Sequence, residues 1–187
     1  MLRIKSFHAV IMITTFFLIG ISVAIGSTME EKLSKGGIDL ILNGEGFRIA
    51  YGMRMYLCGL YLSQKNSNPA KIIDSDSSMA VKMIIYSSLI TGKRLEKSTR
   101  EGFMNSTKGN PGRLTSRIDN FLSIVASDLK KGDIFLFFYS PQNGTQIIKN
   151  GTYKGVIDGL DFKKALFGIW LCDKPPAQEL KEKLLGN

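Results

Sequence analysis

The sequence predicts an α+β domain in which a large antiparallel sheet carries a layer of helices on one face. Short strand-like segments joined by hairpin turns lie on both sides of a helical middle section. The regular strand–helix alternation of a doubly wound fold is missing, which favours the antiparallel arrangement. The chain has 187 residues, of which 44% are hydrophobic and 22% charged, as expected for one globular domain with its own core.

The first half of the domain is predicted to form strands. Ile38–Leu42 has the pattern of a short strand, and Asn43–Gly46 is predicted to be the turn that closes it. Phe47–Ala50 and Met53–Leu62 are predicted to pair around the turn Tyr51-Gly52. Met53–Leu62 is apolar on both faces, which is typical of a central strand covered on both sides.

The remaining elements alternate between helical and strand patterns. Residues 63–78 are polar and turn-rich and precede a strand at Met79–Tyr86. A modest helix is predicted to begin near Thr91-Gly92, and a stronger one to run from Thr115 until Gly132 stops it. The later strands are predicted at Asp133–Tyr139, Thr145–Lys149 and Tyr153–Ile157, with hairpin turns at Pro141–Gly144 and Asn150-Gly151. The last two helices are predicted at Phe162–Leu171 and Pro176–Leu185.

The N-terminus has the pattern of a signal peptide. Arg3 and Lys5 precede the apolar run Ala9–Ile25, and small residues at Ala24 and Gly26 suit cleavage. We therefore expect residues 1–26 to be a signal peptide and residues 27–187 the exported domain, periplasmic or extracellular. The apolar run of about 17 residues is at the lower limit of a membrane span, so an uncleaved anchor stays an alternative. After cleavage no stable membrane span is expected.

Composition excludes several functional classes. The formal net charge is +9, but Lys and Arg are spread along the chain without long runs, which favours a solvated basic surface over nucleic-acid binding. The single histidine, His8, lies in the targeting segment, so a histidine-based triad or a zinc site is not expected, nor is a cofactor. Cys58 and Cys172 either pair in a disulfide or remain two separate buried thiols.

Three segments in a fixed order resemble the chalcone isomerase-like family, in particular its short exported bacterial members. They span nearly all of the predicted mature chain: Asn43–Arg48 with Tyr56–Leu62; Leu89–Gly92 through Arg100–Phe103; and Lys131–Asp133, Asn150-Gly151 and Asp161–Leu171. The resemblance implies an open-faced β-sandwich, a large antiparallel sheet with a layer of helices packed on one face.

The resemblance also implies ring closure of a chalcone to a flavanone, with an arginine, a threonine, a tyrosine, a lysine and an asparagine as the catalytic set. Arg48 falls on the arginine and Tyr56 on the threonine. Leu95, Ser98 and Gly102 take the places of the tyrosine, the lysine and the asparagine. Because one group of five is retained as such, chalcone cyclisation by this mechanism is not expected.

Non-catalytic plastid members of the family keep an arginine and bind fatty acids. A desolvated guanidinium can hold a carboxylate through two hydrogen bonds, and Tyr56 offers a second donor. The resemblance therefore implies a ligand-binding cleft for a small hydrophobic or amphipathic carboxylate such as a fatty acid. The ligand-binding residues implied by it are Arg48, Tyr56, Leu95, Ser98 and Gly102.

Alternatives remain at the level of function and of single residues. The protein could be an isomerase or intramolecular lyase that uses Arg48 on an unidentified substrate, or an interaction protein with a vestigial cleft. Arg48 could be a surface arginine at a turn, and Tyr56 a core aromatic. Phe167 and Trp170 are interpreted as packing between helix and sheet, and Met83 as either core or cavity lining. The sequence does not determine an oligomeric state.

Overall fold

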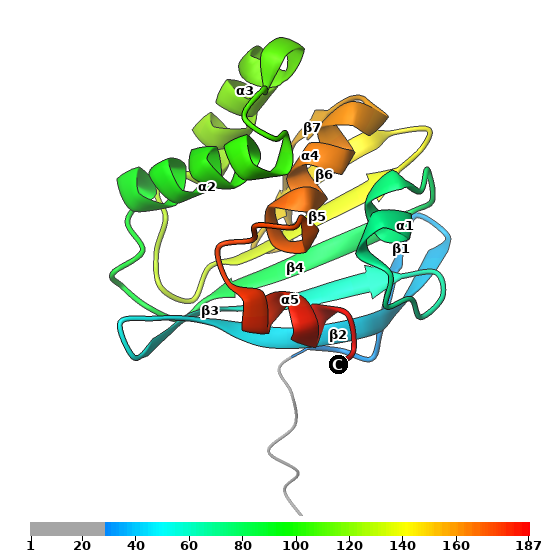
Figure 1. The fold of residues 1–187 in the computed structure, drawn as a ribbon, viewed down its shortest axis with the longest axis horizontal. Coiled ribbons are helices and arrows are strands. Elements are labelled where there is room, and N and C mark those ends of the chain that lie inside the picture. The colour runs from blue at the N-terminus through cyan, green and yellow to red at the C-terminus, as the bar shows by residue number, and fades with distance from the viewer. Residues whose placement is uncertain (1–28) are drawn as a thin grey trace, which may run out of the picture.

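The computed structural model describes residues 29–187, which form one seven-stranded antiparallel sheet with helices on one face (Figure 1). The predicted α+β class and the open-faced arrangement are confirmed. The strands are β1 (Lys32–Lys35), β2 (Ile38–Ala50), β3 (Met53–Leu62), β4 (Met79–Ile85), β5 (Ile134–Ser140), β6 (Gly144–Lys149) and β7 (Thr152–Ile157). The helices are α1 (Pro69–Asp74), α2 (Gly92–Ser106), α3 (Thr115–Val125), α4 (Leu160–Leu171) and α5 (Gln178–Leu184). The predicted signal peptide, residues 1–26, lies outside the described residues.

The order of the strands in the sheet is the order of the strands in the chain, from β1 to β7. Two predicted hairpin turns are confirmed. Tyr51 and Gly52 connect β2 to β3, and Asn150 and Gly151 connect β6 to β7, all four with positive φ angles. The helices α2 and α3 are inserted between β4 and β5, yet these two strands still pair directly.

The turn predicted at Asn43–Gly46 is wrong, because β2 continues through it with only a register shift between Leu42 and Gly44. The glycines serve close packing instead: a Cβ atom added to Gly44 would lie 2.0 Å from the carbonyl oxygen of Lys183 in α5. Beside it, the buried Asn43 side chain donates a 2.8 Å hydrogen bond to the carbonyl of Leu184. The segment Asn43–Gly46 therefore allows α5 to pack closely against β2.

Three further differences concern short or terminal segments. The strand β1 was not predicted, and α1 lies within residues 63–78, which were expected to be irregular. Helix α1 begins where the side chain of Asn68 accepts a hydrogen bond from the Lys71 N–H and where Pro69 fixes the first helical φ. Helix α3 ends at Val125 rather than near Gly132, since Asp128 already adopts a φ of 46° that a continuing helix excludes.

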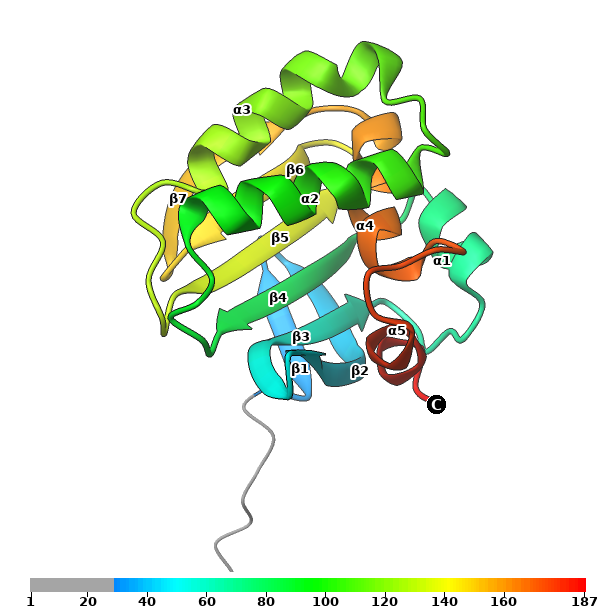
Figure 2. The same cartoon turned by 60° about the vertical axis from the view of Figure 1, so that its left-hand side comes forward.

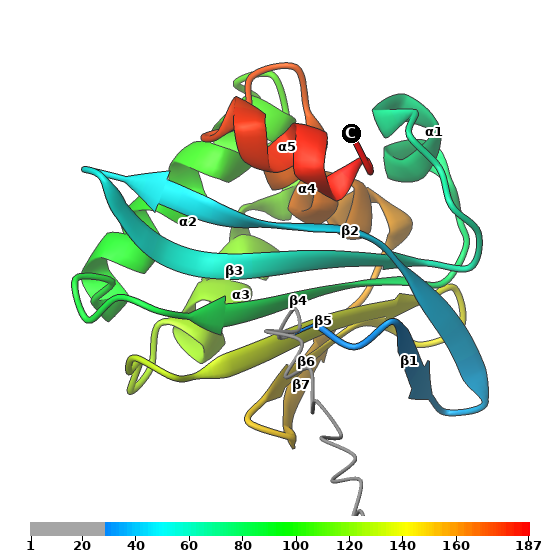
Figure 3. The same ribbon diagram turned by 90° about the horizontal axis from the view of Figure 1, so that it is seen from below.

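The main core lies between the sheet and the helices. Figure 2 shows α2 and α3 crossing over the sheet with α4 behind the end of α2, and Figure 3 shows α5 above β2 and β3. Ring contacts link the layers: Phe121 of α3 lies 5.3 Å from Phe137 of β5 and 5.8 Å from Phe162 of α4. These contacts bury the apolar stripes of the helices against the apolar face of the sheet.

A smaller apolar cluster lies on the opposite face of the sheet. Figure 3 shows β2 bending so that β1 lies on the side away from the helices. The cluster contains Met29, Leu40, Leu57, Tyr61, Ala80, Phe138 and Ile148. Within residues 29–187, no helix is long and apolar enough to cross a bilayer.

Candidate ligand-binding site

A cavity of about 370 Å³ lies between the sheet and helices α2, α3 and α4. The structure brings all five predicted ligand-binding residues to its lining, namely Arg48, Tyr56, Leu95, Ser98 and Gly102. Their part in binding stays a prediction. Most of the remaining wall is apolar and comes from Met83, Phe121, Val125, Phe137, Leu166, Ile169 and Trp170.

Arg48 and Tyr56 are direct cross-strand partners on β2 and β3. Residues opposite each other in an antiparallel pair have Cβ atoms about 4.5–5.5 Å apart, so both side chains enter the cavity from one place. The half-buried Arg48 guanidinium donates a hydrogen bond to the carbonyl of Ile49. Across residues 29–187, no carboxylate forms an ion pair with Arg48, and the guanidinium has further N–H groups to offer.

The Tyr56 hydroxyl accepts a 3.1 Å hydrogen bond from the Trp170 indole N–H. Burial raises the pKa of Tyr56, and the neighbouring Cys58 thiol adds to the rise. The hydrogen bond from Trp170 and the charge of Arg48 oppose it without reversing it. Tyr56 is therefore a neutral phenol whose own O–H can still donate to a ligand.

Helix α2 supplies one long wall of the cavity. The helix begins at Thr91, whose side chain accepts a hydrogen bond from the Arg94 N–H at 3.3 Å. Leu95 is buried and faces the cavity, while the exposed Ser98 lies at the rim. The Ser98 hydroxyl donates to the Leu95 carbonyl at 3.1 Å, so in this arrangement it presents an acceptor to a ligand.

Gly102 has a packing role that explains its presence. A Cβ atom added at this position would lie 2.7 Å from Cγ2 of Ile169, so the glycine lets α2 approach α4 closely. Nearby, the Ser106 hydroxyl donates a 2.7 Å hydrogen bond to the carbonyl of Ala165. Gly102 thus shapes the cavity through the helix contact and offers a ligand no polar side chain.

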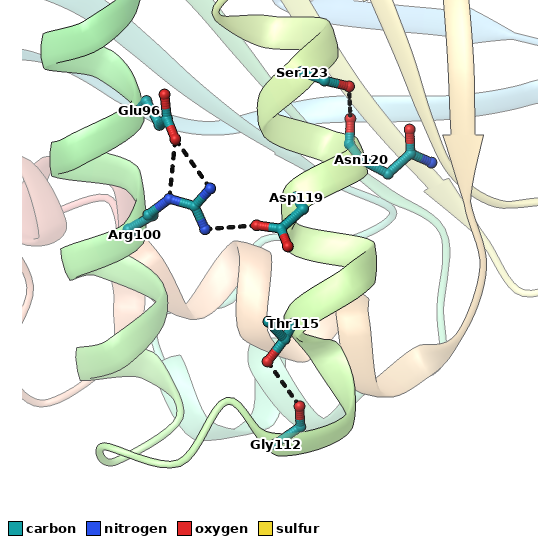
Figure 4. A network of polar contacts seen from close by, with 7 residues as sticks. All are labelled: Glu96, Arg100, Gly112, Thr115, Asp119, Asn120 and Ser123. Carbon is teal, nitrogen blue, oxygen red and sulfur yellow. Dashed lines mark hydrogen bonds and ion pairs between the residues drawn. The ribbon is translucent and has the colours of Figure 1, made fainter.

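An ion-pair network joins α2 to α3 beside the cavity (Figure 4). Arg100 of α2 contacts Glu96 one turn earlier at 3.0 Å and Asp119 of α3 at 2.7 Å. All three side chains are partly exposed, and such pairs contribute little free energy. The network links the two helices, and Phe121 and Val125 of α3 line the cavity.

Sequence reasoning missed two features of the lining. Trp170 was interpreted as packing, and its ring does stack on Phe137 at 6.4 Å, but its N–H also orients Tyr56 inside the cavity. Glu101 was not considered, and its exposed carboxylate lines the rim. The single tryptophan of the chain was a usable signal for the first feature, since buried indole N–H groups require an acceptor.

Two parts of the third resembling segment, Lys131–Asp133 and Asn150-Gly151, are structural and lie away from the cavity. The buried Asp133 carboxylate accepts 2.8 Å hydrogen bonds from the Asn150 side chain and the Lys130 N–H, and Lys149 lies 2.9 Å away. Burial opposes ionisation of Asp133, but these hydrogen bonds and Lys149 outweigh it and lower its pKa. The segments therefore fasten the β6–β7 turn to the start of β5.

The next feature is the state of the two cysteines and of possible metal-ligating side chains within residues 29–187. Cys58 and Cys172 are both free thiols, and burial raises the pKa of Cys58. Across residues 29–187, no three His, Cys, Asp or Glu side chains gather as a metal site would need.

Comparisons with known proteins agree with the fold. No curated protein sequence matches the chain. A fatty-acid binding protein of Arabidopsis thaliana has a similar structure, with a TM-score of 0.64 and 12% sequence identity, over 83% of this chain and 96% of that chain. At this identity the likeness shows a shared fold. A family model described as chalcone isomerase-like matches residues 22–186. Because that match spans most of the sequence, the chain belongs to the chalcone isomerase-like family.

Proposed function

We propose that the cavity binds a small amphipathic carboxylic acid such as a fatty acid, and that the protein performs no chemistry on it. The observation that carries the proposal is the cross-strand pairing of Arg48 with Tyr56 in an otherwise largely apolar cavity. A guanidinium that forms no ion pair with a carboxylate of residues 29–187 and a neutral phenol form a two-donor site for a carboxylate.

The size and walls of the cavity fit an acyl chain. A volume of about 370 Å³ lies within the range of roughly 300–1,000 Å³ that is usual for small-molecule sites. The apolar wall from α3, α4 and the sheet would remove the chain from water, at about 0.8 kcal/mol for each buried methylene. The Glu101 carboxylate at the rim repels an anion, which favours placing the head group at Arg48.

The family relationship supports the same class of ligand. The structurally similar Arabidopsis protein carries the name fatty-acid binding protein, and it shares the fold of this chain over most of both lengths. The polar head would then lie between β2 and β3, and the chain would extend under α2.

The residues in the cavity argue against catalysis. Leu95 and Gly102 offer no donor or acceptor, and the Ser98 proton is already donated to a backbone carbonyl. The raised pKa of Tyr56 makes that phenol a poor proton-transfer group near neutral pH. The supporting groups that the family's cyclisation chemistry employs are therefore missing at the matched positions.

Calorimetric titration with a long-chain fatty acid tests the proposal. Arg48→Ala should weaken binding by about 1.5–3 kcal/mol, because it removes a charge-assisted contact. Arg48→Lys should recover only part of this loss, since an ammonium cannot form the two-pronged contact. Arg113→Ala is the matched control, because it removes an exposed arginine that does not line the cavity.

The methyl ester of the same acid separates head-group recognition from burial of the chain. It should bind the wild type about as weakly as the free acid binds Arg48→Ala. Equal affinity of the acid for wild type and Arg48→Ala would refute carboxylate binding by Arg48. Ring closure of a chalcone above the spontaneous rate, abolished in Arg48→Ala, would replace the binding proposal with the isomerase alternative.

We place this function outside the cytoplasm. The support is the sequence pattern of residues 1–26, with its positive start, apolar run and small residues before position 27. N-terminal sequencing of the native product should find a protein that lacks these residues. A product that begins at Met1 and sediments with membranes would instead establish an anchor.

A further inference from the structure

Four large apolar side chains are exposed together at one end of the sheet. Tyr51 is 91% exposed at the β2–β3 turn, beside Ile49 at 48% and Met53 at 42%. Leu89, 39% exposed, lies in the β4–α2 connection. Figures 1 and 3 show this connection beside the β2–β3 turn at the same end of the sheet. We call these four residues the apolar tip.

Backbone hydrogen bonds hold the two halves of the apolar tip together. The N–H groups of Tyr86 and Ser87, at the start of the β4–α2 connection, both donate to the carbonyl of Met55 at 2.9 and 3.0 Å. Met55 follows the turn by a few residues on β3. The tip is therefore a fixed feature of the fold, because ordered backbone supports both of its parts.

Tyr51 is an unusual residue at this position. It has a φ of +53°, in the left-handed region that a bulky side chain seldom adopts, and Gly52 follows at +71°. Asparagine or glycine would form this two-residue turn with less strain. Because the phenol ring is almost wholly in solvent, no burial within the described chain offsets the strain. Strained residues cluster at functional sites, so Tyr51 is a candidate for contact with a partner outside the protein.

The surroundings of the tip are positively charged. Arg54, Lys93 and Arg94 are exposed beside it, and Arg54 lies over the Phe47 ring at 4.4 Å from its centroid. Neither residues 46–73 nor residues 77–95 contain Asp or Glu. At this end of the sheet, Asp133 is buried and paired with Lys149, Glu96 is held by Arg100, and Asp128 is an exposed carboxylate in the connection between α3 and β5.

We infer that the apolar tip and its cations dock on the surface of an anionic lipid bilayer. Tyrosine is enriched at membrane–water interfaces, where its ring lies among acyl chains and its hydroxyl reaches the head groups. Ile49, Met53 and Leu89 would enter the same boundary, and the flanking cations would contact lipid phosphates. A small projecting turn fits insertion into lipid better than a flat protein interface, which buries about 800 Å² on each partner.

Charge also disfavours a second copy of this chain as the occupant. A twofold contact through the tip would bring the same cations face to face, whereas an anionic surface neutralises them. The docking inference does not depend on ligand binding. It adds to the proposed function in that Arg48, at the head-group end of the cavity, belongs to the same hairpin as Tyr51.

The test uses the full chain carrying Tyr51→Trp, mixed with vesicles whose phosphatidylglycerol has brominated acyl chains. The native indole of Trp170 is buried, so wild-type emission should be unquenched and serves as the internal reference. The indole introduced at position 51 should lose emission and shift to shorter wavelength on these vesicles. On brominated phosphatidylcholine, which is neutral overall, the loss should be much smaller.

A charge-reversed pair provides the second arm. Arg54→Glu with Lys93→Glu, added to Tyr51→Trp, should abolish the quenching, whereas Arg113→Glu with Lys174→Glu makes the same net change elsewhere and should preserve it. Unquenched emission from protein that sediments with the vesicles, or equal quenching by both lipids, would overturn the inference. So would a short-wavelength indole that depends on protein concentration without vesicles, since a second copy would then cover the tip.

Discussion

Lys163 of α4 shows how one buried charge holds two helices together. Its side chain is entirely buried, and Nζ donates to the carbonyls of Ile72, Ile73 and Ser75 at 3.0, 2.9 and 2.6 Å. These carbonyls lie at the end of α1, where a helix leaves acceptors without internal partners. Burial, assisted by Lys164, lowers the pKa of Lys163 to about 8, so the group is mainly an ammonium at neutral pH.

Replacing Lys163 should reveal this role through stability and its pH dependence. Lys163→Met should lower the free energy of unfolding near pH 7 by about 1–3 kcal/mol, because buried carbonyls lose their donor. Between pH 8 and the ordinary lysine value of 10.5, the unfolded wild type binds more protons than the folded protein. The free energy of unfolding of the wild type should therefore rise with pH across this window, and Lys163→Met should not show this rise.

Urea denaturation from pH 7 to 10.5 measures both effects. Lys164→Met is the matched control, since Lys164 is on the same helix, is partly exposed and forms an ion pair with Asp74 at 3.0 Å. It should alter stability little and keep most of the wild-type pH dependence, because burial, the main cause of the lowered pKa of Lys163, is unchanged. Parallel pH profiles for wild type and Lys163→Met would show that Lys163 has the same pKa in both states.

The sequence identified residues that line the cavity, but it did not reveal the structural reason for each of them. All five residues matched through the family resemblance line the cavity. However, Gly102 is required by Ile169 on α4, a contact that only the packed helices reveal. Lys163 was equally hidden, since α4 is buried nearly all round and a lysine beside Lys164 resembles a solvated pair.

At the scale of elements, β2 and α5 show why local patterns mislead. Asn43–Gly46 carries the residues of a turn, and glycine is favoured for turns and for close backbone approach alike. Here the second reason applies, because α5 lies against β2 from far along the chain. Strand and helix periodicity was enough to predict the longer elements, but β1 and α1 are too short and polar to be recognised from pattern alone.

Gly44→Ala should test the seating of α5. The added Cβ would lie 2.0 Å from the Lys183 carbonyl oxygen and 2.9 Å from that of Leu184, and backbone atoms cannot rotate away. We expect a loss of about 1–3 kcal/mol in the free energy of unfolding, as for overpacked sites. Amide hydrogen exchange in α5 should accelerate at the same time, because the helix loses its fit.

The control for that variant is Gly52→Asn at the β2–β3 turn. A Cβ atom there meets no atom within 4 Å, and asparagine tolerates the positive φ of this position. Its denaturation midpoint should stay near that of the wild type. An unchanged midpoint and unchanged exchange in Gly44→Ala would mean that α5 does not lie against Gly44 in solution.

For the whole molecule, the fold class was predictable because hairpin turns at both ends of a helical insert leave few other arrangements. The distribution of charge on the surface was not predictable. Lys and Arg are spread along the sequence, which favoured a uniformly solvated basic surface, yet folding gathers Arg54, Lys93 and Arg94 around the apolar tip. Such a patch combines residues from separate strands and a loop, so composition and charge runs cannot reveal it.

The strand order affects how the chain can fold during synthesis, which starts at the N-terminus. Each strand pairs with the one made just before it, so the sheet can grow by one strand at a time without waiting for distant partners. Helix α5 is the exception, because it packs on β2. The carbonyl of Leu184 accepts a hydrogen bond from the side chain of Asn43, which lies 141 residues earlier in the chain. A chain cut short before residue 178 would thus have a complete sheet with a bare glycine groove, and Asn43 would lose its hydrogen bond to Leu184. Helix α5 therefore completes the fold. A chain that lacks it would expose apolar surface, which is the signal that cellular quality control recognises in incompletely folded proteins.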